Sequence, residues 1–187
     1  TRRCLQVLAE FRNPVTIVTN NHLVTRDLDI LQELAAAQAA SVNLSITTLD
    51  KSLRLLLEPR TSRADLRLDA IAKLNAAGIP AGVMVAPVIP GLTDHDLEAI
   101  LDTAVAHGAR YAGWIMLRLP REVAPLFRDW LAVHHPLRAK HVMSLVQQMR
   151  GGRDYDAAFG TRQRGHGKIA ELVAKRFAIA CRRCGLN

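Results

Sequence analysis

The run IPAGVMVAPVIPGLTD, from Ile79 to Asp94, decides the fold of this chain. An apolar run rich in β-branched residues predicts a strand buried on both faces, as in a parallel sheet covered by helices. Pro87 and Pro90 cannot continue a central strand, so we expect the chain to leave the sheet near them. Ligands bind at the carboxyl ends of such strands. The alternative is a core strand followed by a stiff loop that binds nothing.

Helix and strand patterns alternate on both sides of this run. The predicted helices cover about residues 1–12, 28–35, 62–77 and 93–107, and the other predicted strands cover residues 15–18, 42–48 and 112–117. Regular alternation of this kind indicates a parallel sheet with right-handed crossovers. We therefore predict an α/β fold.

Four strands are too few to close a barrel, so we expect a partial (β/α) barrel whose first strands precede Thr1. The chain does not begin with Met, and we expect it to be an internal or C-terminal piece of a longer protein. After Pro120 the strand signal stops and helical patterns follow. We divide the chain into a partial barrel over residues 1–122 and a basic helical C-terminal extension over residues 123–187.

Two serine and threonine positions resemble helix starts. Ser62 is followed by Asp65, and Thr93 by Asp96, which is the spacing of a weak capping box. The residues between the strand at 42–48 and Ser62 predict a long loop.

The strand at residues 42–48 alternates between apolar and polar side chains. Its apolar positions are Val42, Leu44 and Ile46, and its polar positions are Asn43, Ser45 and Thr47. In a parallel barrel the apolar side faces the outer helices and the polar side faces inward, where hydroxyls suit a polar ligand. The alternative is that Ser45 and Thr47 only bond to neighbouring backbone.

The net charge of +8 is unevenly distributed. Residues 1–136 contain 14 basic and 14 acidic side chains, whereas residues 137–187 contain 11 basic and 3 acidic ones. A neutral segment followed by a basic C-terminal segment suggests a polyanionic partner, and a nucleic acid is the first candidate. A solvated helical surface is the alternative.

Cysteine usage and hydropathy indicate a cytoplasmic protein without a membrane span. The cysteines Cys4, Cys181 and Cys184 are too few for a secreted disulfide framework, and no apolar run approaches the length of a membrane span. The CxxC spacing of Cys181 and Cys184 lacks a second ligand pair, so we expect no metal site there.

Two loops carry candidate binding residues. Glu58-Pro59-Arg60 follows the strand that carries the hydroxyls. Arg60 can bind a carboxylate through two parallel hydrogen bonds. Glu58 can orient Arg60 or can bind an amine or a ribose hydroxyl. A weak surface ion pair is the alternative. The second loop, Gly160 to Lys168, combines glycines with cations that can reach phosphates, or is simply a flexible charged loop.

The chain contains no nucleotide-binding glycine fingerprint, P-loop, nucleophile elbow or zinc-protease helix. Any activity must therefore use a cofactor or residues outside this chain.

Several stretches together resemble the radical S-adenosylmethionine superfamily, in the branch of spore photoproduct lyase and its bacterial relatives. The stretches are LSIT at residues 44–47, LEPRTS at 57–62, VAPVIPG at 85–91, HVMSL at 141–145, GGRDYD at 151–156 and FGTR at 159–162. The resemblance covers nearly the whole chain.

This resemblance implies a partial (β/α)₆ barrel and a [4Fe–4S] cluster held by a CxxxCxxC loop. In the family the cluster reduces S-adenosylmethionine and releases a 5′-deoxyadenosyl radical. The three-cysteine motif is absent here, so the resemblance implies that the cluster ligands lie upstream of this chain and that this piece alone binds no cluster and is inactive.

The resemblance also implies positions for the cofactor. Ser45 lies near its ribose or methionine part with Thr47 nearby, Arg60 holds its carboxylate, and Ala86 lies against adenine. Asn20 stands where relatives often carry a lysine, so that charged contact is lost or replaced. The lyase has a tyrosine that serves its radical relay, and this chain has Gln163 and Arg164 in the matching place. This difference from the lyase argues against thymine-dimer repair as the reaction.

Three functions follow as hypotheses. The first is a radical S-adenosylmethionine enzyme, lyase-like, acting on a nucleic-acid or other anionic substrate. The second is a nucleic-acid-binding module without chemistry, which uses Arg162, Arg164 and Lys168 of the basic C-terminal segment. The third is a conventional barrel enzyme with another small ligand.

Overall fold

The computed structural model describes residues 1–186. The elements are α1 (Arg2–Glu10), β1 (Val15–Thr19), the 3₁₀ turn η1 (His22–Asp27), α2 (Leu28–Ala36), β2 (Ala40–Ile46), α3 (Lys51–Leu57), α4 (Ala64–Ala76), β3 (Ala81–Val88), the 3₁₀ turn η2 (Asp94–Asp96), α5 (Leu97–Ala106), β4 (Ala112–Met116), α6 (Val123–His134), α7 (Pro136–Gln148) and α8 (Gly167–Cys184). This order confirms the predicted α/β fold.

The four strands form one parallel sheet in the order β1-β2-β3-β4. Each strand lies beside its neighbour in sequence, as expected for consecutive right-handed crossovers. The ladder between β2 and β3 ends with the pair Ile46 and Val85. Thr47 and Ala86 therefore lie directly beyond the last pair of this ladder, at the carboxyl edge of β2.

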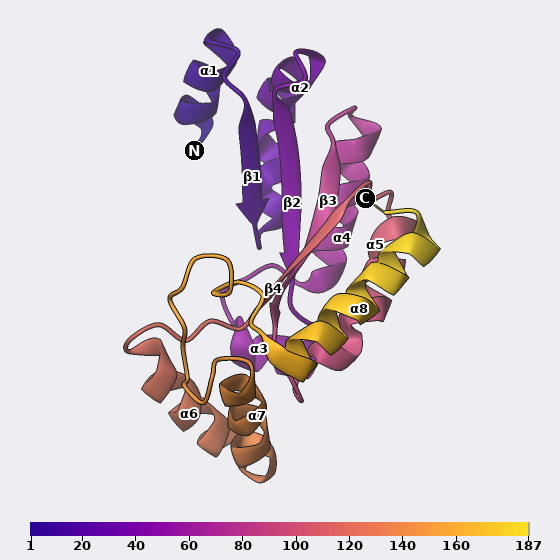
Figure 1. The fold of residues 1–187 in the computed structure, drawn as a ribbon. Coiled ribbons are helices and arrows are strands. Elements are labelled where there is room, and N and C mark those ends of the chain that lie inside the picture. Colours follow the sequence, from indigo (N-terminus) through magenta and orange to yellow (C-terminus); the bar gives the residue numbers. More distant parts are fainter. Residues whose placement is uncertain (187) are drawn as a thin grey trace.

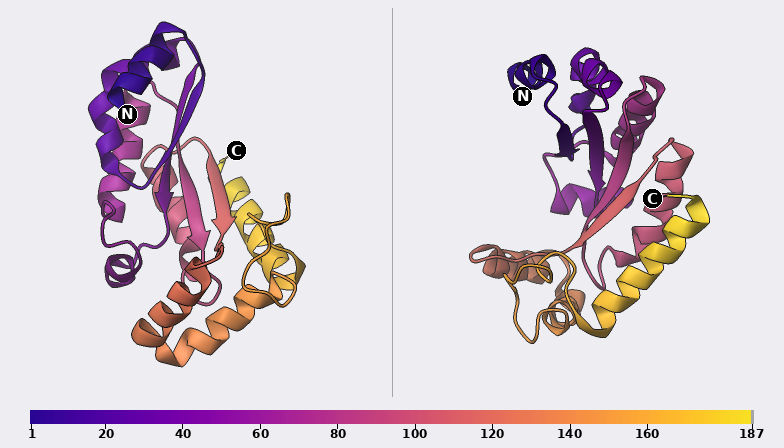
Figure 2. Two further views of the ribbon diagram at one scale, coloured as in Figure 1. Left: turned by 90° about the vertical axis from the view of Figure 1, so that its left-hand side faces the viewer. Right: turned by 45° about the horizontal axis from the view of Figure 1, so that its top comes forward.

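Helices cover one face of the sheet, and the other face is more open. Figure 1 and Figure 2 show α2, α4 and α5 behind the strands, with α8 beside β4. Val42, Leu44 and Ile46 are fully buried in the core on the helix side. The predicted alternation of β2 is thus confirmed, and Asn43 and Ser45 lie on the opposite, inner face.

A second, smaller core lies beyond the carboxyl ends of the strands. It joins α6 and α7 to the segments that follow β3 and β4, and its buried members are Leu53, Ile89, Leu92, Leu117, Leu119, Leu131, Val142, Met143 and Val146. Figure 1 shows α6 and α7 at this end of the molecule. The helix α8 instead joins the main core through Ala170, Val173 and Ala180.

Two local predictions are wrong. The expected long loop before Ser62 contains α3, whose first turn is capped by Asp50: its carboxylate accepts bonds from the Ser52 and Leu53 amides. The strand β3 ends at Val88, between Pro87 and Pro90, so the prediction that the chain leaves the sheet near these prolines is confirmed; its pairing with β4 carries a register shift between Val85 and Val88. A bulge accommodates a proline that a regular ladder would exclude.

The second error concerns the two capping boxes. The helix α4 begins at Ala64 after Arg63, and the Ser62 hydroxyl is used elsewhere. The Thr93 hydroxyl accepts a bond from the Ile89 amide and does not cap α5.

Within residues 1–186, no helix combines the length and apolar character that a membrane crossing requires.

Candidate functional site

Two hydroxyls converge on one carbonyl at the carboxyl edge of the sheet. Ser45 Oγ lies 3.1 Å from the Ala86 carbonyl oxygen, and Thr47 Oγ1 lies 3.0 Å from the same oxygen. Because the backbone ladder ends at Ile46 and Val85, these side chains continue the link between β2 and β3. The structure therefore shows the bonding to neighbouring backbone that the sequence left as an alternative. Ser45 is partly exposed, whereas Thr47 is buried.

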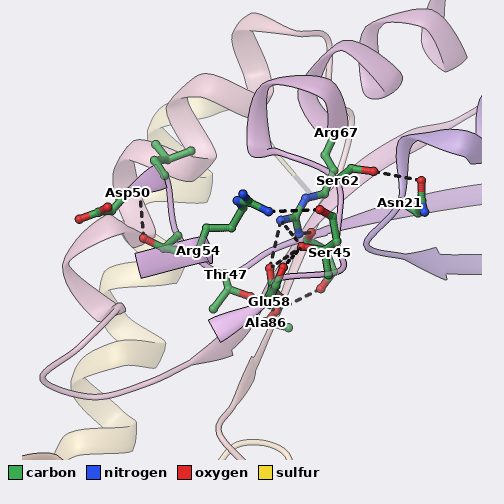
Figure 3. Close-up of polar contacts among 12 residues, drawn as sticks. Asn21, Ser45, Thr47, Asp50, Arg54, Glu58, Ser62, Arg67 and Ala86 are labelled. Atoms are coloured by element: carbon green, nitrogen blue, oxygen red, sulfur yellow. Dashed lines mark hydrogen bonds and ion pairs between the residues drawn. The ribbon is translucent and has the colours of Figure 1, made fainter. Parts of the chain in front are cut away.

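Glu58 joins this pair of hydroxyls to a buried arginine. Its Oε1 accepts a bond from Thr47 Oγ1 at 2.8 Å, and its Oε2 accepts one from Arg67 Nη2 at 3.0 Å. Figure 3 shows Glu58 between Thr47 and Arg67. The prediction that Glu58 orients Arg60 is wrong, since Arg67 takes that carboxylate.

Arg67 is the residue of this network that the sequence interpretation missed. Its side chain is fully buried, and it also donates to the Ser45 carbonyl oxygen and, over 3.3 Å, to Thr61 Oγ1. Its Nε has no partner within the described residues. A signal was present, because Arg67 precedes Ile71 and Leu74 at helical spacing and so falls on the buried stripe of α4. A buried arginine in such a stripe requires a partner.

The turn at residues 58–62 is fixed to two strand ends. Thr47 and Arg67 hold it at Glu58, next to β2. Next to β1, the Ser62 amide donates to the Asn20 carbonyl oxygen over 3.3 Å, and the Ser62 hydroxyl donates to Asn21 Oδ1 over 3.0 Å. The turn therefore bridges the carboxyl ends of neighbouring strands.

Arg60 lies in this fixed turn but remains free itself. Its side chain is exposed, and neither an ion pair nor a hydrogen bond engages it within residues 1–186. Asn20, at the end of β1, is likewise exposed. The structure thus brings Ser45, Thr47, Glu58 and Ala86 into direct contact, and it places Asn20 and Arg60 on the adjoining turn and strand end.

The cations predicted to bind nucleic acid lie in another segment, the loop between α7 and α8. The loop is bonded to β4, since the Met116 amide donates to the Gln163 carbonyl oxygen over 2.8 Å. The guanidinium of Arg164 stacks 4.1 Å from the centre of the Trp114 ring, and that of Arg162 lies 5.2 Å from the centre of Phe159. Burial lowers the pKa of Arg164.

Arg150 anchors this loop to the same edge of the sheet. It is buried and donates to the carbonyl oxygens of Leu117 and Thr161, each over 2.9 Å. Burial lowers the pKa of Arg150 as well. The loop is therefore held at the carboxyl edge of β4. Lys168, the third predicted cation, is exposed in the first turn of α8.

A cavity of about 420 Å³ lies apart from this cluster of hydroxyls. Residues of the β2–α3 connection, of α3 and of the first turns of α4 line it: Thr48, Leu49, Asp50, Lys51, Arg54, Leu55, Arg63, Ala64, Asp65 and Leu68. Its wall is mainly apolar and includes neither Ser45 nor Ala86. It therefore does not mark the site described above.

The residues of this chain do not fit an iron–sulfur cluster. Cys4 lies on α1, and Cys181 and Cys184 lie on α8. Cys184 donates to Asp102 Oδ1 over 3.0 Å, and this bond raises the pKa of Cys184. Among residues 1–186, no three histidine, cysteine or acidic side chains gather in a way that could hold a metal ion.

Comparison with known proteins gives one family. The model of the radical SAM superfamily matches residues 2–104, which is more than half of the chain. This span includes the strand ends and the turn that carry Ser45, Thr47, Glu58, Arg60 and Ala86.

The curated relatives are longer than this chain. An uncharacterized protein of Mycobacterium tuberculosis is 36% identical over 131 residues, which cover 69% of this chain and 38% of the relative. An uncharacterized protein of Methanocaldococcus jannaschii is 28% identical over 126 residues, which cover 67% of this chain and 45% of the relative. The chain thus spans less than half the length of either relative. No solved structure matches it.

Proposed function

Since this chain belongs to the radical SAM superfamily, we propose that it forms part of a radical S-adenosylmethionine enzyme. By this proposal, the residues of this chain bind the nucleoside and the amino-acid end of S-adenosylmethionine. The observation that carries the proposal is the cluster of Ser45, Thr47 and Ala86 at the sheet edge, with the free cation of Arg60 on the adjoining fixed turn.

The side chains present suit the chemistry of this cofactor. Arg60 can bind a carboxylate with two parallel hydrogen bonds, because its exposed guanidinium has no partner among the described residues 1–186. Ser45 can donate to or accept from a ribose hydroxyl. Ala86 has a small side chain and is partly exposed at the edge, which leaves room for a flat ring such as adenine. Asn20 adds a neutral amide beside them.

In this superfamily, bound S-adenosylmethionine supplies a 5′-deoxyadenosyl radical, which acts on the substrate. The cysteines of this chain do not fit the partner cluster. We place the cluster ligands in sequence upstream of Thr1, in keeping with the greater length of the relatives. By this proposal the chain binds and orients the cofactor, and the cluster chemistry belongs to the rest of the protein.

Calorimetric titration with S-adenosylmethionine tests the proposal. Removal of the Arg60 charge by Arg60→Met deletes a charge-assisted contact of about 1.5–3 kcal/mol, so the dissociation constant should rise roughly 10- to 100-fold. Ser45→Ala should raise it about fivefold. The control is Arg63→Met in the same segment, because Arg63 already pairs with Asp65. Unchanged affinity in Arg60→Met, or no binding by the wild-type protein, contradicts the proposal.

The loop between α7 and α8 supports an anionic substrate. Arg162 and Arg164 stack on aromatic rings and have no carboxylate partner within residues 1–186, whereas Arg128, Arg176 and other arginines are paired. Stacked guanidinium and aromatic groups suit phosphates together with bases. We propose a nucleic acid as the first candidate, with spore photoproduct lyase-like chemistry as the finer hypothesis.

The same loop favours the second function, a nucleic-acid-binding module without chemistry. Binding of single- and double-stranded DNA at increasing salt separates the two functions. A salt-dependent affinity that Arg162→Gln and Arg164→Gln weaken, and that S-adenosylmethionine does not change, favours the module. An affinity that is independent of both arginines contradicts the nucleic-acid proposal in either form.

A further inference from the structure

The hydrogen bonds around Ala86 contain one more donor than the carbonyl requires. Ser45 Oγ and Thr47 Oγ1 both point at the Ala86 oxygen, and Thr47 Oγ1 also lies 2.8 Å from Glu58 Oε1. Each hydroxyl has a single proton. Thr47 can therefore donate to Glu58 or to Ala86 at one time, but not fully to both.

We propose that Thr47 is a reserve donor that frees Ser45 for the cofactor. Without ligand, Ser45 donates to the Ala86 carbonyl and Thr47 donates to Glu58. When Ser45 turns its proton to a ligand oxygen, Thr47 turns from Glu58 to Ala86. The Ala86 carbonyl then keeps a donor in both states, so that the Ser45 contact is made without leaving this carbonyl unpaired. This inference rests on the proposed S-adenosylmethionine site.

The exposure of the two hydroxyls matches these separate roles. Ser45 is partly exposed and can reach a ligand, whereas Thr47 is 2% exposed and is enclosed by the protein. Thr47 is thus a positioning residue, and Ser45 is the one that touches the ligand. An Ala86 carbonyl that the bound ligand covers and that has no donor would cost as much as the Ser45 contact gains, so the reserve donor decides whether that contact strengthens binding.

Arg67 allows Glu58 to give up the hydrogen bond that it accepts from Thr47. When Thr47 turns away, the Glu58 carboxylate keeps the bond from Arg67 Nη2 at 3.0 Å and lies 3.5 Å from Thr61 Oγ1. Arg67 is itself held between Glu58, Thr61 and the Ser45 carbonyl. Both remaining contacts are to Oε2, so Oε1 gives up its Thr47 bond in the second state, but the charge of the carboxylate stays paired with Arg67, as that of a lone buried carboxylate would not be.

A double-mutant cycle on Ser45 and Thr47 tests the inference. The dissociation constant for S-adenosylmethionine is measured by calorimetry for the wild-type protein, Ser45→Ala, Thr47→Val and the double variant. Thr47→Val should weaken binding about three- to tenfold in the wild-type background, because Ser45 must then stay on Ala86. In the Ser45→Ala background the same change should have almost no effect, since no Ser45 contact remains to be freed.

Two further variants serve as a rescue and as a control. Thr47→Ser restores the hydroxyl and should return the affinity to within about twofold of the wild type. Thr16→Val is the matched control, because the Thr16 hydroxyl bonds to Ser41 Oγ at 3.0 Å and lies far along β1 from the site. Thermal melts of each variant identify any loss of folding.

The outcomes are distinct. If Thr47→Val weakens binding equally with and without Ser45, Thr47 acts only on the structure of the edge and the inference is wrong. If Thr47→Val leaves the affinity unchanged, it is also wrong, although the cofactor site stands. If the wild-type protein does not bind S-adenosylmethionine, the proposed function itself fails.

Discussion

Gly82 shows how a single residue shapes the inner face of the sheet. A Cβ atom at this position would lie 2.5 Å from Tyr111 Cδ2 and would also meet the Tyr111 carbonyl oxygen. The Tyr111 hydroxyl lies 3.0 Å from the carbonyl oxygens of both Val42 and Pro80, and burial raises its pKa. Only glycine lets this ring lie against β3 and close the amino-terminal end of the inner face.

We expect Gly82→Ala to lower the free energy of unfolding by about 1–3 kcal/mol, because backbone must move to admit the methyl group. Gly113→Ala on the neighbouring strand is the matched control. Its Cβ would meet the flexible end of the Met84 side chain at 2.9 Å, so its effect should be smaller. Urea denaturation measures both. Equal losses in the two variants would show that the Tyr111 contact is not what requires glycine.

The residues of the site divide into those that sequence reasoning could place and those that it could not. The alternation of β2 predicted the side of the sheet on which Ser45 lies, because strand geometry has period two. Neighbouring positions in the sequence did not predict that Glu58 pairs with Arg67, because Arg67 lies on α4 and not in the Glu58–Arg60 segment. Tertiary contacts decide such pairings, and only the buried helical position of Arg67 hinted at it.

At the scale of elements, α8 is joined to the sheet through α5. Arg176 on α8 binds Glu98 on α5 with a two-bond pair, in which Nε and Nη2 lie 2.8 Å and 2.7 Å from the two carboxylate oxygens. The same guanidinium lies 3.5 Å from Asp94 Oδ2. The Trp114 and Phe177 rings pack 6.0 Å apart beside it. The helix therefore joins the main fold by a polar and an apolar contact.

The Glu98 pair makes the attachment of α8 depend on pH. The bond from Arg176 lowers the pKa of Glu98. A lowered pKa means that the stabilisation is complete above the unfolded value, near 4.3, and is lost as pH falls through the folded value below it. Because both side chains are about one-third exposed, we expect Glu98→Gln to cost only about 0.5–1 kcal/mol at pH 7.

Urea denaturation at pH 7 and near pH 3 checks this expectation. The difference between Glu98→Gln and the wild type should be smaller at the lower pH, because the lowered pKa of Glu98 means that the stabilisation is lost as the pH falls below the unfolded value. Glu33→Gln is the control, because no ion pair engages Glu33 within residues 1–186. A difference that persists unchanged at low pH would show that the charge of Glu98 does not stabilise the contact.

Elements with strong periodicity were predictable, and elements decided by short-range caps were not. The four strands and the long helices followed from apolar spacing. The helix α3 was missed because it has only seven residues and starts at an Asp50 cap between polar neighbours. Ser62 and Thr93 carried cap-like spacing, but nearby backbone and side chains took their hydroxyls instead. Local bonding of this kind competes with helix capping.

At the scale of the whole molecule, the two edges of the sheet differ. The loop between α7 and α8 covers part of the β4 edge through the bond between the Met116 amide and the Gln163 carbonyl. The other edge is β1, and no strand of residues 1–186 pairs with its outer side. An open parallel edge is a place where another strand can add. The predicted partial barrel accounts for this edge.

The basic excess and the proposed cofactor site occupy different parts of the molecule. The candidate cofactor residues come from β2, β3 and the turn before α4, within the span of the family match. Arg162 and Arg164, which have no carboxylate partner among residues 1–186, lie in the loop beside β4. This arrangement suits a substrate that approaches across the carboxyl edge, with the loop on one side and the cofactor on the other.

Hydrogen exchange of the protein with and without S-adenosylmethionine tests the central claim most directly, because it locates the ligand on the whole molecule. We predict slower exchange at residues 45–47, at the 58–62 turn and at residues 86–88 when the ligand is present, and the Arg60→Met variant should lose this protection. Protection confined to the apolar cavity between α3 and α4, or no protection at any of the three segments, would contradict the account.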